Sequence, residues 1–499
     1  MDALLAQAAD SDKGLKRTLT AWSLIALGIG AIIGAGLFVR TAAAAGGHAG
    51  PAVTLSFIIA AVGCAFAGLC YAEFASMIPI AGSAYTYAYT TMGELIAWII
   101  GWALVLEYAL GAATVAIAWS EYFNKLLDGA IPYEWTHSPF QSEIINGVSH
   151  SGIMNAPALL ILFILSLLLI RGTQQSAAVN AIIVVIKVVI VLVFIAIGWQ
   201  FVQGANHTPY FIPADQQPVH MADGSTYSYM DTFRHGWGGV LRGAAIVFFA
   251  FIGFDAVSTA AQEAKNPKRD MPIGILGSLA ICTVLYILFS YVLTGVAPFT
   301  EFMVSGKEAS VANAIENHMP GYHWLATAVT IAILAGFSSV ILVMLLGQSR
   351  VFYSMANDGL LPSAFSQLHS KFRTPFKSNW ILFVFVGGLA TLLPGDITGD
   401  LTSIGTLFAF VLVSAGVWIM RVKQPNVPRP FKTPLVPIVS SLGVLVCTAM
   451  IISLDITTKL TALAWMVIGL FIYFGYSRSR SKHKSPGGII PQASDFDKH

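Results

Sequence analysis

The fold of this chain is interpreted from a glycine-rich stretch near the N-terminus, Gly28-Ile29-Gly30-Ala31-Ile32-Ile33-Gly34-Ala35-Gly36-Leu37-Phe38. Each glycine lowers helix stability by about 1 kcal/mol relative to alanine. An unwound turn here would expose backbone N–H groups at the positive end of the helix that follows, and such an end binds a carboxylate. The stretch therefore predicts a helix that is broken in the middle, with an anion site at the break.

A second break is predicted in the stretch Phe248-Phe249-Ala250-Phe251-Ile252-Gly253-Phe254-Asp255. Carbonyl oxygens freed there would accept hydrogen bonds from an ammonium group, so the two breaks together match an α-amino acid. Glycines in membrane helices also serve close helix packing, which is the alternative interpretation. The positions in the first and sixth apolar runs favour the breaks, because paired broken helices mark the substrate site of inverted-repeat transporters.

The composition places the chain in a membrane. Of 499 residues, 56% are hydrophobic and 10% are charged, the net charge is +2, and the mean hydropathy is +0.72. Soluble proteins carry about 25% charged residues, so this chain cannot cover itself with a polar surface. A soluble enzyme, a disordered linker and a disulfide-stapled secreted domain are excluded. The even charge balance also gives no basic patch for nucleic acid, and membrane lipid is the expected surrounding.

Twelve apolar segments meet or nearly meet the length that a helix needs to cross a bilayer. They lie near residues 19–39, 51–79, 94–121, 155–171, 176–201, 239–263, 273–297, 323–351, 378–394, 401–421, 435–454 and 459–476. The runs are continuous rather than alternating, which favours helices over a β-barrel. The two longest connections, about residues 122–154 and 202–238, are expected to be external and to carry short helices.

Basic and acidic residues fall on opposite sides of the predicted membrane. Arg171, Lys268 and Lys377 are examples from the basic side, and Asp128 and Glu301 are examples from the acidic side. The positive-inside rule then places the basic side, and both termini with it, in the cytoplasm.

Three ionisable residues are predicted to lie deep in the membrane: Glu107 in the third segment, Lys187 in the fifth and Asp255 in the sixth. Such groups are costly unless they are paired or hydrated, so each is a candidate for proton coupling. The alternative for Lys187 is a fixed ammonium that satisfies backbone carbonyls. The alternatives for Glu107 and Asp255 are a structural hydrogen bond to a neighbouring helix and a place in a polar network.

The sequence contains no pattern for a metal, a cofactor or catalysis. None of the eleven histidines lies at membrane depth, no phosphate-binding glycine loop ends in Lys-Ser/Thr, and no nucleophile–base pair stands out. The four cysteines, Cys64, Cys70, Cys282 and Cys447, fall inside apolar runs, so no external thiol is left for a disulfide-linked heavy chain. We therefore expect neither an enzyme nor a metalloprotein.

Several motifs resemble those of the amino acid–polyamine–organocation superfamily, and within it the bacterial relatives of the cationic amino acid transporters. They are Gly34-Ala35-Gly36, the stretch Phe249 to Asp255, and Met355-Ala356-Asn357-Asp358-Gly359-Leu360-Leu361-Pro362, with Glu107 and Lys187 at matching places. Ala35 stands where the family commonly has a hydroxyl residue, which removes a side-chain donor but leaves the backbone site. The resemblance covers about residues 15–475.

The resemblance implies an all-α integral membrane protein with twelve transmembrane helices in the LeuT-type arrangement of five plus five inverted repeats. Helices 1 and 6 would be broken and helices 11 and 12 peripheral. The implied organisation is a cytoplasmic segment at 1–18, a first repeat at 19–201, an extracellular loop at 202–238, a second repeat at 239–421, the last two helices at 435–476 and a cytoplasmic tail at 477–499.

The resemblance also implies the site residues. The substrate carboxylate would bind at Ile32, Ile33, Gly34, Ala35 and Gly36, and the amine at Phe249, Ala250 and Ile252. The Lys187 ammonium would occupy the region where sodium-coupled relatives hold an ion, which favours proton coupling, with Glu107 and Asp255 as further candidates.

The predicted function is alternating-access transport of L-amino acids across the cytoplasmic membrane, energised by the proton gradient. Small neutral substrates such as alanine are favoured, because aromatic residues line the sixth helix, and broader specificity that includes cationic amino acids stays open. The alternatives are a sodium-independent amino acid or amine exchanger on the same fold and, in a different class, a channel or membrane sensor. A bacterial source is expected.

Overall fold

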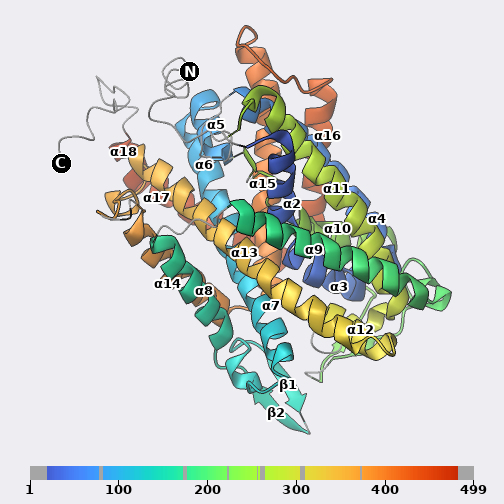
Figure 1. The fold of residues 1–499 in the computed structure, drawn as a ribbon. Coiled ribbons are helices and arrows are strands. Elements are labelled where there is room, and N and C mark those ends of the chain that lie inside the picture. Colours follow the sequence, from blue (N-terminus) through green and yellow to red (C-terminus); the bar gives the residue numbers. More distant parts are fainter. Residues whose placement is uncertain are drawn as a thin grey trace.

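The structure is a computed structural model, and it describes residues 19–77, 83–145, 147–171, 177–221, 224–255, 257–258, 264–303, 310–370, 372 and 374–481. The predicted N-terminal segment 1–18 and most of the predicted tail lie outside these residues. The described chain is a bundle of packed helices with short strands at one end (Figure 1).

The apolar runs form helices, as predicted. The α-helices are α2 (Ala21–Ile32), α3 (Thr41–Ala44), α4 (Val53–Met77), α5 (Ser83–Thr91), α6 (Glu94–Val105), α7 (Gly111–Leu126), α8 (Ala156–Ile170), α9 (Ala177–Gly198), α10 (Gly236–Val247), α11 (Pro267–Val296), α12 (Ser310–His318), α13 (His323–Asn357), α14 (Phe376–Leu392), α15 (Gly395–Lys423), α16 (Val436–Ser453), α17 (Ile456–Ile472) and α18 (Arg478–Arg480).

Every one of the twelve predicted segments overlaps at least one of these helices. Among the described residues, eight helical stretches are long and apolar enough to cross a membrane, and four shorter apolar helices accompany them. The chain is therefore a multi-pass membrane protein. The count of twelve spans and the five-plus-five arrangement stay predictions.

Short π-helical turns interrupt several of the membrane helices, and two of them lie near the predicted site residues. One turn, Gly36–Arg40, begins the second half of the first helix, and another, Leu106–Leu110, joins α6 to α7. Such turns in α-helices are frequent at functional sites, because they change which side chains face the interior.

The outer connections differ from the prediction of short helices alone. The first contains the antiparallel pair β1 (Ser142–Ile145) and β2 (Val148–Ser151), and the second contains β3 (Val219–His220) and β4 (Thr226–Tyr227). Helices α5 and α12 lie between predicted spans and were not predicted; the polar residues in both weaken the hydropathy signal.

The packing follows the polarity of the helix faces. Helices α2, α3 and α10 lie in the middle of the bundle, with α8 beside α14 on one flank and α4 beside α16 on the other (Figure 1). The middle helices are largely buried, whereas α9 and α17 expose many apolar side chains. Exposed apolar side chains on a membrane helix face lipid, so the broken helices are shielded by the outer ones.

Candidate functional site

The first helix breaks where its glycines predict. Helix α2 ends at Ile32, and Ile33 takes an extended conformation with φ −72° and ψ 106°. Beyond the break, Leu37 and Phe38 donate backbone hydrogen bonds of 3.1 and 3.4 Å to the carbonyl of Gly34. The first N–H groups of a helix have no intrahelical partner, so those around Gly34 to Gly36 lie at the positive end of the second half-helix.

The sixth helix also breaks as predicted. Helix α10 passes into a 3₁₀ turn at Phe248–Phe251 and then leaves helical geometry at Ile252, with φ −59° and ψ 135°. Gly253 follows with a positive φ of 110°. A Cβ atom at Gly253 would also lie 2.9 Å from the carbonyl oxygen of Ala31, so this glycine is required both by its conformation and by its contact with the first helix.

The two breaks touch each other. A Cβ atom added to Gly36 would lie 2.1 Å from the Cα of Ala250, so no larger residue fits at Gly36 without separating the backbones. The hydroxyl of Tyr286 in α11 lies 3.0 Å from the carbonyl oxygen of Ile32 and 2.9 Å from that of Ala250. One phenol thus donates to the carbonyl ends of both breaks, a role that the sequence analysis missed.

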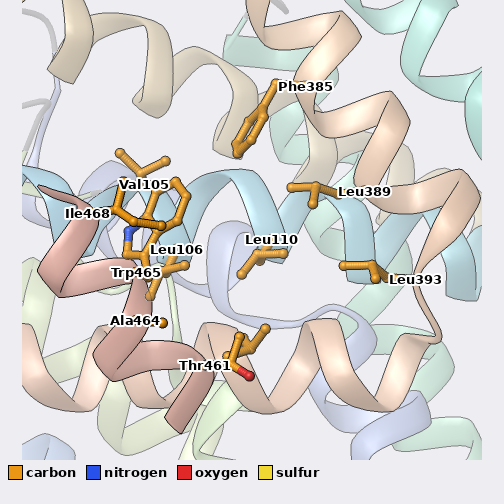
Figure 2. Close-up of a pocket in the computed structure, with 11 residues that line it drawn as sticks. Val105, Leu106, Leu110, Phe385, Leu389, Leu393, Thr461, Ala464, Trp465 and Ile468 are labelled. Atoms are coloured by element: carbon orange, nitrogen blue, oxygen red, sulfur yellow. The ribbon is translucent and has the colours of Figure 1, made fainter. Parts of the chain in front are cut away.

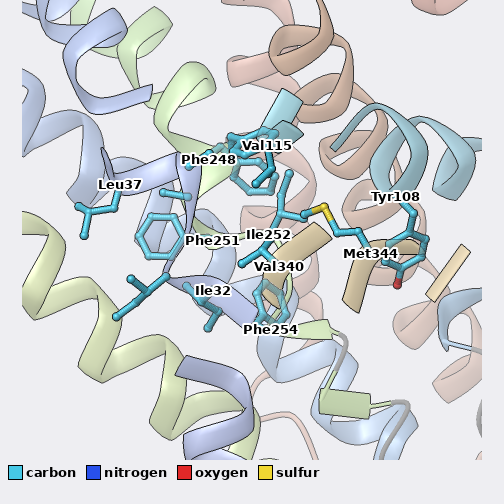
Figure 3. Close-up of a cluster of buried hydrophobic side chains, with 14 of the residues drawn as sticks. Ile32, Leu37, Tyr108, Val115, Phe248, Phe251, Ile252, Phe254, Val340 and Met344 are labelled. Atoms are coloured by element: carbon cyan, nitrogen blue, oxygen red, sulfur yellow. The ribbon is translucent and has the colours of Figure 1, made fainter. Parts of the chain in front are cut away.

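The structure brings the eight predicted substrate-binding residues together at the two touching breaks and buries them all. They are Ile32, Ile33, Gly34, Ala35, Gly36, Phe249, Ala250 and Ile252. Apolar side chains surround the breaks; Figure 3 labels Val115, Ile252, Val340 and Met344 among them. A Cβ at Gly34 would lie 3.1 Å from Val340 of α13. The candidate site is thus closed to solvent in this conformation and apolar apart from its backbone groups.

Lys187 reaches the first break from α9. Its ammonium donates a 2.8 Å hydrogen bond to the carbonyl oxygen of Gly30, and the side chain is buried. Gly336 of α13 provides the room: a Cβ there would lie 2.7 Å from Cε of Lys187. Lys187 therefore ties α9 to the last turn before the break, as expected for an ammonium that satisfies a backbone carbonyl.

Glu107 and Asp255 are both fully buried and interact electrostatically. Glu107 lies on the π-helical turn between α6 and α7, and Asp255 follows the second break. The hydroxyl of Tyr108 donates a 3.0 Å hydrogen bond to Asp255, so Asp255 belongs to a polar network. Two buried carboxyl groups that interact repel each other when both are charged.

The fold also buries ionisable groups that the sequence analysis did not single out. Arg40 and Arg242 are 2% and 1% exposed and lie on the first and sixth helices. Both bind Asp400 of α15: Arg40 through Oδ1, and Arg242 through Oδ2 at 2.8 Å. Arg242 also contacts Asp455 at 2.6 Å. We call Arg40, Arg242 and Asp400 the acidic-end cluster.

A second buried cluster closes the basic end. Glu73 at the end of α4 is fully buried and accepts two hydrogen bonds of 2.9 and 2.8 Å from Arg421 of α15. Arg429 lies 3.3 Å from the same carboxylate, and the N–H of Thr433 donates to it at 2.8 Å. We call Glu73, Arg421, Arg429 and Thr433 the basic-end cluster.

One pocket outside the breaks is too apolar for an amino acid. It has a volume of about 260 Å³ and lies between α6, α14, α15 and α17, lined by residues such as Leu106, Leu110, Leu389 and Trp465 (Figure 2). The indole N–H of Trp465 already donates to Trp102. No charged group lines this pocket, so it cannot bind a zwitterion and the two breaks remain the candidate site.

Comparison with known proteins decides the family. A sequence model described as Amino acid permease matches residues 19–480, nearly the whole chain. The chain belongs to the amino acid permease family. The resemblance to the amino acid–polyamine–organocation superfamily is thereby confirmed, and the permease is a transporter rather than an enzyme.

The permease is similar to characterised proteins over almost its full length. It is 43% identical to the branched-chain amino acid permease BcaP of Bacillus subtilis over 481 residues, 96% of this chain and 97% of that protein. It is 38% identical to the methylthioribose transporter of the same organism, over 95% of this chain and 96% of that protein. It is also 34% identical to the vacuolar cationic amino acid transporter 4 of Arabidopsis thaliana, over 84% of this chain and 65% of that protein.

Proposed function

We propose that this permease is a proton-coupled symporter of neutral L-amino acids with apolar side chains, working by alternating access in the cytoplasmic membrane. Branched-chain substrates join the small ones such as alanine, since a relative that is 43% identical is named a branched-chain amino acid permease. The proposed transport does not require sodium. Both termini would lie in the cytoplasm, on the basic side.

The observation that carries the proposal is the contact between the two helix breaks. N–H groups at Gly34 to Gly36 would hold the carboxylate, and the carbonyls of Ile32 and Ala250 lie where an ammonium would bind. Each carbonyl oxygen has two lone pairs, so Tyr286 leaves an acceptor position on both. Val340 and Met344 supply an apolar surface for the side chain.

Coupling to protons is proposed to act through Lys187. Its charged ammonium holds the carbonyl of Gly30, three residues before the break. Loss of the proton would weaken that bond, since a charged donor makes the stronger hydrogen bond, and α2 would then be free to move. Glu107 and Asp255 are the other proposed proton-linked groups.

Alternating access is proposed to depend on the two buried clusters. The acidic-end cluster joins the broken helices to α15, and the basic-end cluster joins α4 to the same helix. With both formed, the site is closed at both ends. Opening one cluster while the other holds would expose the site to one side of the membrane at a time.

Uptake by purified protein in liposomes tests the proposal. We expect an imposed inward proton gradient to drive accumulation of labelled leucine without sodium, and unlabelled isoleucine, valine and alanine to compete. Uptake that needs internal amino acid and ignores the proton gradient would favour the exchanger. Best competition by lysine would overturn the substrate class while keeping amino acid transport, and ion conductance without saturable uptake would indicate a channel.

Methylthioribose belongs in the same competition panel, because a relative 38% identical over nearly its whole length is named a methylthioribose transporter. The proposed site predicts weak competition, since this sugar has neither the carboxylate nor the ammonium that the two breaks would bind. If methylthioribose competed more strongly than unlabelled leucine, the sugar would replace the amino acid as the proposed substrate.

A further inference from the structure

A groove on the outside of the bundle lies between α15 and α16, two helices that run side by side (Figure 1). Its volume is about 600 Å³, within the range of ligand sites. Trp418 and Ile419 on one wall, and Leu445 and Ile452 on the other, are 41% to 62% exposed, so the groove opens outward. A groove on the membrane-facing surface of a permease opens to lipid.

The shape of the groove suits a hydrocarbon chain. On α16 it runs from Ser440 to Ile452, thirteen residues or about 18 Å at helical rise. The hydrocarbon part of one leaflet is about 15 Å thick, half of a bilayer core. Small residues such as Ala415 and Ala449 leave space at the bottom of the groove, and carbon atoms form most of the groove surface. One acyl chain of a leaflet lipid therefore matches the groove in length and in polarity.

Positive charge stands at one end of this groove. Ala415, Ile419 and Lys423 follow one another at intervals of four residues on α15, so Lys423 continues the groove-lining face by one turn. Lys423 is exposed and, within the described residues, makes no ion pair. Lys432, in the connection to α16, is exposed and likewise without an ion pair in the described part of the chain.

The surrounding connection is strongly basic. Arg421 and Lys423 in the last turn of α15, and Arg429 and Lys432 in the connection to α16, lie within twelve positions, and Glu73 is the carboxylate that neutralises part of this charge. Groups of four or more basic residues just beyond a membrane helix bind anionic lipids. Because Arg421 and Arg429 are engaged with Glu73, Lys423 and Lys432 are the ones left for an external anion.

We propose that the groove between α15 and α16 binds an anionic phospholipid, with one acyl chain along Ala415, Val444 and Thr448 and the phosphate at Lys423. The lipid comes from the leaflet at the basic end, the cytoplasmic leaflet in the proposed orientation. Lipid bound there would contact α15, the helix that carries both buried clusters. Lipid binding in this groove depends neither on amino acid transport nor on the candidate substrate site. An experiment can therefore contradict lipid binding without contradicting the proposed function, and the reverse.

Native mass spectrometry of the full chain, exchanged into an equimolar mixture of phosphatidylglycerol and phosphatidylcholine, tests the proposal. We expect the wild type to retain phosphatidylglycerol preferentially. Lys423→Gln should lower that preference about fivefold, the effect of one basic residue near a lipid surface. Lys377→Gln removes the same charge from an exposed residue at the same end of the bundle, on α14, and should retain the wild-type preference.

A second pair of variants tests the groove itself. Val444→Phe places a large ring in the groove and should lower the total lipid retained, whereas Val384→Phe, at a 70% exposed position of α14, should not. If Val444→Phe lowers the yield of folded protein, Thr448→Leu fills the same groove with a smaller change.

Three outcomes would overturn the proposal. Equal retention of both lipids by the wild type would mean that the head group is not recognised. Identical behaviour of Lys423→Gln and Lys377→Gln would remove the phosphate site. Conversion of a dimer to a monomer by Val444→Phe, with lipid retention unchanged, would show that a second copy of the chain occupies the groove.

Discussion

At the residue scale, the candidate site depends on single atoms at places where helices touch. The hydroxyl of Tyr286 joins the carbonyls of Ile32 and Ala250, and the missing side chain of Gly336 makes room for Lys187. A free carbonyl at membrane depth costs several kcal/mol, so these donors stabilise the broken helices when no substrate is bound. The carbonyls of Ile32 and Ala250 therefore have a hydrogen-bond donor in this closed conformation.

Tyr286→Phe removes the shared hydroxyl while keeping the ring contacts with Phe57 and Phe251. We expect a folded protein whose free energy of unfolding falls by about 1–2 kcal/mol, one buried hydrogen bond. The KM for leucine should rise, because the carbonyls lose their fixed geometry. Thermal unfolding and liposome uptake check both expectations, and Tyr291→Phe, on the same helix, is the control. An unchanged KM would exclude Tyr286 from organising the site.

Lys187→Met should remove the pH dependence of uptake, because the proposed coupling group is lost. Gly336→Ala should act in the same direction but more weakly, since the added Cβ would displace the flexible end of Lys187 from Gly30. Initial rates of uptake from pH 5 to 8 measure the effect. Gly388→Ala, at an open position on α14, is the control. A Lys187→Met variant with the wild-type pH profile would falsify the coupling role.

At the scale of elements, α15 is the helix that contributes a residue to the buried cluster at each end of the molecule. Asp400 near its first turns binds Arg40 and Arg242, and Arg421 near its last turn binds Glu73. Removing one partner from a buried ion pair leaves the other charge unpaired, which destabilises by about 3–5 kcal/mol. Loss of one partner from either cluster is therefore costly, and α15 contributes a residue to both clusters.

Asp400→Asn and Glu73→Gln should open the candidate site at opposite ends of the bundle. We expect Asp400→Asn to increase maleimide labelling of a cysteine introduced at Ala42, near the acidic end. Glu73→Gln should increase labelling of a cysteine introduced at Ser258, beyond the second break toward the basic end. Both positions are fully buried, as are the four native cysteines, so background labelling should be low. Equal labelling at both positions in both variants would mean that the clusters stabilise the fold without controlling access.

At the scale of the whole molecule, the two ends of the bundle differ in structure and in charge. The paired strands β1 and β2 and helix α12 lie at one end, and α5 and α18 lie at the other (Figure 1). At the first end, acidic residues contact nearby basic side chains, as Glu316 does Lys125 and Glu134 does His150. The segregation agrees with the sides assigned from the sequence, and which side faces the cytoplasm stays a prediction.

Labelling of intact cells tests this orientation. A cysteine at Phe140, a 75% exposed residue beside β1, should react with a membrane-impermeant maleimide. A cysteine at Lys377, exposed at the start of α14, should react only after the cells are permeabilised. Reversed reactivity would invert the orientation and place the lipid groove in the other leaflet.

The sequence alone was enough for the main helices and for both helix breaks, which depend on neighbouring residues. Apolar runs predicted the helices, because burial in lipid demands a continuous apolar stretch, and α4, α8 and α16 match their predicted ranges within two residues at each end. The glycines predicted both breaks, because weakened helix propensity is local. Lys187, Glu107 and Asp255 stood out by being charged inside apolar runs.

The tertiary structure decided what depends on distant residues. Tyr286 lies 254 residues from Ile32, and Asp400 lies 360 residues from Arg40 and 158 from Arg242. Nothing in the sequence around the tyrosine or the arginines indicates which distant groups they bind. The fold decides whether such a group meets lipid, water or a partner, because helix packing brings together side chains that no local pattern relates. The contact between the two breaks, the two buried clusters and the groove between α15 and α16 all arise in this way.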